Sequence, residues 1–145
     1  MELMLNFVDY AENRPLDGYS SGGELSFAVD GKFFPAEHWY DCVYADLKIW
    51  LPQLISFGSG HTDSCEFSFM DGPFAVRLSR LSDGSVYAVF LRHQKVADAA
   101  HNVDMSMLLK SALSCCRKYD RILHENGQIN QFSDEIRMLM KLLDT

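Results

Sequence analysis

The sequence predicts an α+β fold, in which an antiparallel sheet of about five strands carries helices mainly on one face. Two observations lead to this prediction. Four short segments alternate in hydrophobicity with the period of a strand, and a fifth is apolar throughout. Three longer segments repeat apolar residues at helical spacing, so the expected order of elements is ββαβββαα.

The first two strands are expected near the N-terminus. Residues 2–7 alternate in hydrophobicity, as do residues 24–30. Between them, residues 13–23 include one proline and three glycines, which indicates a loop. Asp30-Gly31 then indicates a turn at the end of the second strand.

A first helix is predicted to begin at Pro35, because proline suits the first turn of a helix and Glu37 adds favourable charge there. Pro52 should loosen the helix near its end, and Gly58-Ser59-Gly60 closes the segment. The helix carries one apolar stripe, which we expect to pack in the core: Trp39, Val43, Leu47, Trp50, Leu51 and Leu54.

Three strands should follow, joined by short turns. Residues 66–69 and 74–78 alternate, and Asp71-Gly72-Pro73 separates them. Ser82-Asp83-Gly84 forms a hairpin-like turn before residues 86–91, which are apolar on both sides and therefore indicate a central strand. Short turns cannot make parallel crossovers, so these strands should pair antiparallel.

The remaining residues predict two helices. Asp104 is a suitable N-cap for the first, and Asn126-Gly127 is a strong stop signal. Ser133 is then expected to cap the last helix. No repeat or linker interrupts the chain, so residues 1–145 are predicted to form a single domain.

Composition narrows the classes of function. No stretch is apolar enough to span a bilayer, and the N-terminus lacks the basic start of a signal peptide, so a cytoplasmic protein without membrane contact is expected. The net charge of −7 argues against binding to nucleic acid. The four cysteines match no disulfide or zinc pattern and are expected to be buried thiols.

The charge is unevenly distributed along the chain. Residues 1–71 contain twelve acids and three bases, for a charge of −9, whereas residues 72–145 carry +2. Such asymmetry favours a cationic partner, although acids kept only for solubility would give the same count. The candidate partner-binding residues lie in two sets, the first in or beside the loop between the first two strands and the second after the first helix: Glu12, Asp17, Tyr19 and Glu24, then Asp63 and Glu66.

No catalytic or cofactor site is predicted from the residue pattern. Gly18-Tyr19-Ser20-Ser21-Gly22 matches the nucleophile elbow of hydrolases, but it lies in a loop that leads into a strand. Gly58-Ser59-Gly60 ends a helix, whereas a phosphate-binding loop opens one. Asp41 and Asp46 are expected to be solvated acids on the first helix. No metal or other cofactor is therefore expected.

Two segments resemble a group of small bacterial proteins. The first contains Asp30-Gly31, Phe34-Pro35, and Trp39 with Asp41, and the second is Phe69-Met70-Asp71-Gly72-Pro73-Phe74. The pattern G-x-x-F-P…W-x-D followed by F-M-D-G-P-aromatic is similar to that of immunity proteins encoded beside polymorphic or contact-dependent toxins. The resemblance covers most of residues 24–92. Physical roles in the fold also account for these residues, because proline, tryptophan and the Asp-Gly-Pro turn each have a structural use.

The leading hypothesis is therefore an immunity protein that binds and blocks a cognate toxin, plausibly a basic nuclease, as a monomer or a homodimer. One alternative is a small metal-dependent or hydrolytic enzyme whose site assembles only in three dimensions, from His61, Asp63, Cys65 and His101. Another is a structural homodimer that pairs through an open sheet edge.

Overall fold

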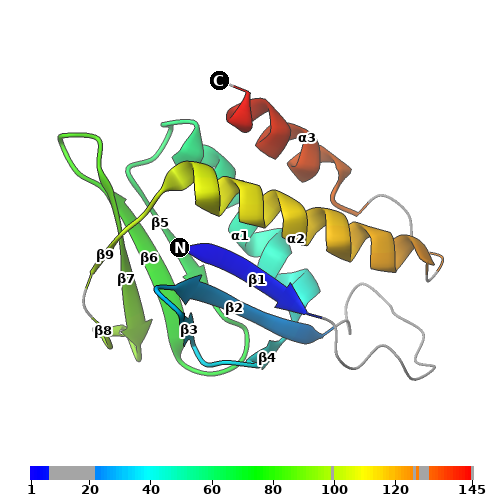
Figure 1. Ribbon diagram of the computed structural model, residues 1–145, viewed down its shortest axis with the longest axis horizontal. Coiled ribbons are helices and arrows are strands. Elements are labelled where there is room, and N and C mark those ends of the chain that lie inside the picture. Colours follow the sequence, from blue (N-terminus) through cyan, green and yellow to red (C-terminus); the bar gives the residue numbers. More distant parts are fainter. Residues whose placement is uncertain (7–21, 99, 126, 128–130, 145) are drawn as a thin grey trace.

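A computed structural model describes residues 1–6, 22–98, 100–125, 127 and 131–144. The predicted α+β class is confirmed: three helices pack with antiparallel strands (Figure 1). The strands, however, divide between two hydrogen-bonded sheets. The strands that the sequence predicts as one sheet therefore lie in two sheets.

Sheet A lies at the N-terminal end of the chain and is built around β2, which pairs with β1, β3 and β4. Its four strands are β1 (Glu2–Asn6), β2 (Gly23–Val29), β3 (Lys32–Phe34) and β4 (Tyr40–Asp41). The two short strands after β2 were not apparent from periodicity, because two or three residues are too few to show an alternation.

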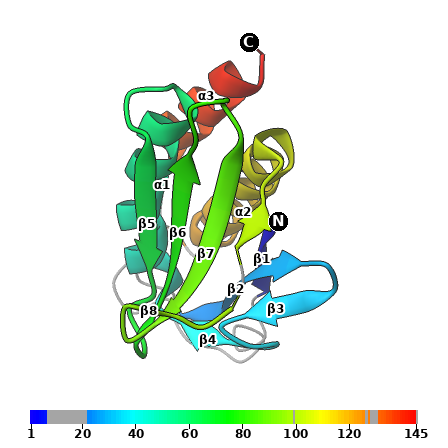
Figure 2. The same ribbon diagram turned by 90° about the vertical axis from the view of Figure 1, so that its left-hand side faces the viewer.

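Sheet B has the order β5-β6-β7-β8, and β9 also pairs with β7. Its five strands are β5 (Ser64–Ser68), β6 (Phe74–Arg80), β7 (Val86–Arg92), β8 (Lys95–Val96) and β9 (His101–Asn102). β5 pairs with β6 alone and is an edge strand. Figure 2 shows β5, β6 and β7 in front with the helices behind, so one face of this sheet carries no helix.

The helices are α1 (Val43–Gly58), α2 (Met105–Glu125) and α3 (Ser133–Leu143). The Asp104 cap is confirmed, since its carboxylate accepts the Met107 N–H at 3.2 Å. The predicted cap at Ser133 is wrong, because Ser133 is already the first helical residue and Phe132 holds the N-cap position. None of the helices in the described part of the chain has the length and hydrophobicity needed to cross a bilayer.

The predicted start of the first helix at Pro35 is also wrong. α1 begins eight residues later, and the intervening residues include β4. Trp39 therefore lies before the helix and is only half-buried, whereas Trp50 occupies the predicted stripe and is buried. Pairing of β4 with β2 explains the difference, because a strand partner competes with helix formation for these residues.

An aromatic cluster joins the two sheets to α1. The Phe27 ring of β2 stacks on Trp50 and on Phe67, at centroid distances of 5.5 and 5.7 Å, and meets Phe69 edge-on at 6.0 Å. All four side chains are at most 5% exposed. Burial of side chains of this size dominates core energetics, so this cluster fixes sheet A and the edge of sheet B on the same helix.

Candidate functional site

The free edge of β5 is hydrogen-bonded by side chains of α1. The Asp46 carboxyl group accepts the N–H of Met70, two residues past the end of β5, at 3.0 Å. The Trp50 indole donates to the Ser68 carbonyl at 2.8 Å, and the Gln53 amide oxygen accepts the Glu66 N–H at 3.2 Å. These side chains take the place that a neighbouring strand would occupy. We call this row of three hydrogen bonds the edge cap.

The geometry of a helix and a strand explains the spacing of the edge cap. The three helical positions follow one another at four and three residues and therefore share one face of α1. The backbone groups that they bind belong to alternate residues, which point to the same side of a strand. Seven residues of a helix span about 10 Å and four residues of a strand about 13 Å. The row of helix side chains and the row of backbone groups that they bind are therefore of similar length.

The edge cap makes Glu66 N–H and the Ser68 carbonyl unavailable to another strand. The homodimer predicted as an alternative, formed through an open sheet edge, would have to use a different edge. Replacing Gln53 with alanine should expose the Glu66 N–H and lower the free energy of unfolding by about 1 kcal/mol.

Urea unfolding measures that loss for Gln53→Ala, and sedimentation velocity over a range of concentrations measures self-association through the uncovered edge. Gln94→Ala is the matched control, because Gln94 is exposed and lies away from this edge. An unfolding free energy equal to that of the unsubstituted protein would show that the Gln53 bond contributes nothing to stability.

Asp41 is the acceptor for three donors from two segments. Its carboxylate accepts the Trp39 indole N–H at 2.9 Å, the Cys42 N–H at 2.8 Å and the Asp71 N–H at 3.2 Å. The side chain is 2% exposed. Three donors compensate the loss of hydration that burial of a carboxylate requires.

Asp46 is fully buried beside this group. Burial, followed by interaction with the Asp41 carboxyl, raises the pKa of Asp46 to about 9. Asp46 therefore carries a proton at neutral pH, and only its Oδ1 accepts a hydrogen bond among the described residues, from Met70. The sequence predicted that Asp41 and Asp46 are solvated acids on the first helix, and this prediction is wrong: both are buried, and Asp41 lies in β4.

Together, Asp41 and Asp46 hold the turn between β5 and β6. They bind the backbone of Met70 and Asp71, which are both exposed. Gly72 has φ +80°, and a Cβ there would lie 3.1 Å from the Phe74 ring and 3.4 Å from Trp39. The backbone angle favours glycine, and a Cβ would also be in tight contact with the Phe74 ring. The two sequence segments that carry the family resemblance meet at this turn.

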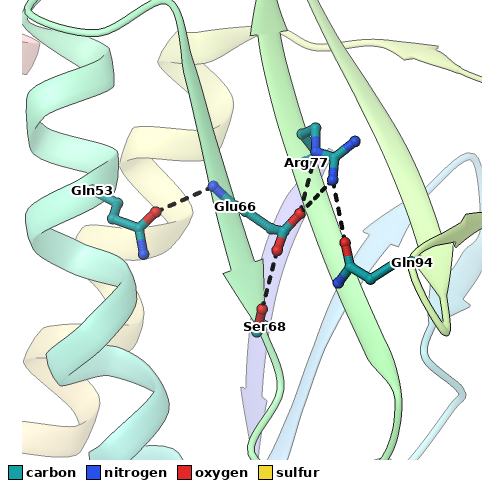
Figure 3. A network of polar contacts seen from close by, with 5 residues as sticks. All are labelled: Gln53, Glu66, Ser68, Arg77 and Gln94. Carbon is teal, nitrogen blue, oxygen red and sulfur yellow. Dashed lines mark hydrogen bonds and ion pairs between the residues drawn. The ribbon is translucent and has the colours of Figure 1, made fainter.

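A second polar network lies on the face of sheet B that no helix covers (Figure 3). The Arg77 guanidinium donates to one Glu66 carboxylate oxygen, at 3.2 Å from Nε and 2.8 Å from Nη2, and to the Gln94 amide oxygen at 3.3 Å. Glu66 and Arg77 are cross-strand partners in the register of β5 and β6. Exposed pairs of this kind contribute a few tenths of a kcal/mol.

Among the candidate partner-binding residues that the structure describes, Glu24 lies apart from Asp63 and Glu66. Glu24 lies in β2 of sheet A, whereas Asp63 and Glu66 lie at β5 of sheet B. Glu12, Asp17 and Tyr19 fall outside the described residues. Two of the three described carboxylates face an arginine of the same chain, Arg80 at 3.6 Å from Asp63 and Arg77 at 2.8 Å from Glu66. The third, Glu24, lies 3.1 Å from His38 Nδ1, and this contact raises the pKa of His38.

The residues of the alternative enzyme site are also dispersed. Cys65 and His101 belong to the same row of sheet B, but β6 and β7 lie between them, which separates them by about 14 Å. Burial raises the pKa of the Cys65 thiol to about 12, so it is not a thiolate at neutral pH. Among the described residues, no three His, Cys, Asp or Glu side chains are grouped to hold a metal ion.

Ser59 and His61 form one exposed nucleophile–base pair at the end of α1. The Ser59 hydroxyl and His61 Nδ1 are 2.5 Å apart, but the hydroxyl also donates to the Ser56 carbonyl at 3.1 Å. A hydroxyl has one proton. When that proton is donated to Ser56, His61 must act as donor to the serine oxygen, which is the reverse of what general-base activation requires.

The geometry defines an α+β protein in which helix side chains cap a sheet edge and two buried carboxyl groups hold an exposed turn. No family model matches the chain, and no curated protein or solved structure matches it.

Proposed function

We propose that this chain is an immunity protein that neutralises a bacterial toxin by binding to it directly. The resemblance of residues 24–92 to immunity proteins suggests the class. The β5–β6 turn is the structural observation that supports a binding role, because it presents an exposed apolar side chain on a fixed backbone.

Met70 is the proposed anchor of the interface. Its side chain is 58% exposed, which among the large apolar residues that the structure describes is second to Val96 at 67%. Its backbone N–H is bound by Asp46, and the next N–H is bound by Asp41. Methionine is enriched at protein interfaces, and a backbone already fixed in its bound conformation loses less entropy on association.

An apolar anchor, rather than an acidic surface, is the expected source of affinity. A basic nuclease was proposed as the toxin because of the acidic first half of the chain. Asp63 and Glu66 are already opposite arginines of their own chain, and Asp46 is uncharged at neutral pH. Glu24 is already in contact with His38. A toxin surface with an apolar pocket is therefore a better partner for this turn than a surface defined by positive charge.

Co-expression with the product of the neighbouring gene, tested as the toxin, examines the function. Cells that produce both proteins should survive, and the two proteins should elute together on gel filtration. A toxin that remains fully lethal and elutes alone would contradict the immunity function.

Replacing Met70 with alanine should weaken toxin binding by about tenfold or more, as expected for a buried anchor at an interface centre. Isothermal titration calorimetry measures the affinity. Leu81→Ala is the matched control, since Leu81 is also half-exposed, at 49%, but lies at the turn between β6 and β7. Equal affinities for both variants would exclude the β5–β6 turn as the anchor.

A further inference from the structure

The outer face of α2 concentrates positive charge. The helix buries one side against the rest of the protein, including Leu108, Ala112, Cys116 and Tyr119. The opposite side, which we call the basic face, consists of Lys110, Ser114, Arg117, Lys118 and Arg121. These positions recur at intervals of three and four residues, so they form one stripe along the helix.

The basic face and Leu113 line an open hollow of about 410 Å³, and all of these lining residues belong to α2. Figure 1 shows α2 running between α3 and β1. Four of the five side chains of the basic face are exposed, and Lys118 is partly buried. From Lys110 to Arg121 the basic face extends about 16 Å, at about 1.5 Å per residue. The hollow is too open to enclose a small molecule. Its length along α2 suits contact with a second helix.

Two cations of the basic face have no partner among the described residues, Lys110 and Arg121, and both are exposed. The Arg117 guanidinium lies 3.2 Å from the Met140 sulfur, which leaves its charge uncompensated at that contact. Four cations elsewhere in the described chain differ from these. Lys48, Arg77, Arg80 and Arg137 each form an ion pair with a carboxylate.

We propose that the basic face docks an acidic helix of a protein partner. Carboxylates spaced at three and four residues on such a helix would meet cations that repeat at the same intervals. The inference rests on the proposed function in one respect, that the partner is a protein. A nucleic acid fits less well, because the whole chain carries a net charge of −7 and would repel a continuous phosphate backbone.

A fluorescent helical peptide with glutamates at alternating intervals of three and four residues is the probe, and fluorescence anisotropy measures its affinity. The double variant Lys110→Gln, Arg121→Gln should bind it about fivefold more weakly, the size expected for two exposed ion pairs. Lys32→Gln, Lys95→Gln is the matched control, which removes the same charge at exposed positions of β3 and β8. Far-ultraviolet circular dichroism checks that every variant is folded.

The control variant should bind as the unsubstituted protein does, and added salt should weaken binding because exposed charges are screened. Equal binding by both double variants would overturn the assignment to α2. A duplex DNA of matched charge that bound more tightly than the peptide would overturn the choice of a protein partner. Protection of cells from the toxin without peptide binding would refute only the basic face, and peptide binding without protection would refute only the immunity function.

Discussion

Replacing Asp41 with alanine should lower the free energy of unfolding by about 3–5 kcal/mol. The substitution leaves the Trp39 indole, the Cys42 N–H and the Asp71 N–H without their acceptor. Two of these donors belong to the segment before α1, and the third belongs to the β5–β6 turn. Loss of one side chain should therefore release both segments together.

Urea denaturation measures the effect of Asp41→Ala. Asp41→Asn should lose less stability, since the amide oxygen still accepts hydrogen bonds. Asp71→Ala is the control within the same turn. The Asp71 side chain is exposed, so its removal should change the free energy of unfolding by less than about 0.5 kcal/mol. A loss below about 1 kcal/mol for Asp41→Ala would contradict the role assigned to this carboxylate.

Replacing Asp46 with asparagine should make the protein more stable than the unsubstituted form at neutral and higher pH. In the folded protein the pKa of Asp46 is raised to about 9, from 3.8 in the unfolded chain. Between these values the folded state binds one more proton than the unfolded state. The contribution of Asp46 is therefore fully present below pH 3.8 and is lost as pH rises towards about 9.

The slope of this loss is about 1.4 kcal/mol per pH unit within that window. Asparagine has no proton to lose and can still accept the Met70 N–H, so the slope should disappear in Asp46→Asn. Urea unfolding of both proteins between about pH 5 and pH 8 gives the difference in stability. His38, whose pKa is raised by its hydrogen bond to Glu24, contributes equally to both proteins. Parallel curves for the two proteins would show that Asp46 is ionised when folded.

The edge cap and the buried carboxyl groups explain why sequence reasoning missed the site. Asp46, Trp50 and Gln53 share a helix face, which the sequence does show. The prediction that Asp46 is solvated was wrong because the sequence does not indicate that the free edge of β5 lies against this face. A polar residue on an apolar stripe, such as Asp46 beside Leu47 and Trp50, is the one signal that could have indicated burial.

The hypothesis of a cationic partner, which was based on charge counts along the chain, also left out contacts that form only on folding. The charges of −9 and +2 are correct counts along the chain. Folding places Arg77 and Arg80 of the second half opposite Glu66 and Asp63 of the first. A sum over sequence cannot include these pairs, because they form between strands that the fold brings together.

The sequence by itself determined the α+β class, the principal strands and the Asp104 cap, because periodicity and capping depend on residues that are close along the chain. Only the tertiary structure decided where α1 begins, which carboxyl groups are buried and which charges are paired. Asp41 binds Asp71, thirty residues away, and Asp46 binds Met70, twenty-four residues away. The protonation of a carboxyl group depends on the dielectric and the donors around it, and those come from segments that meet only in the folded chain.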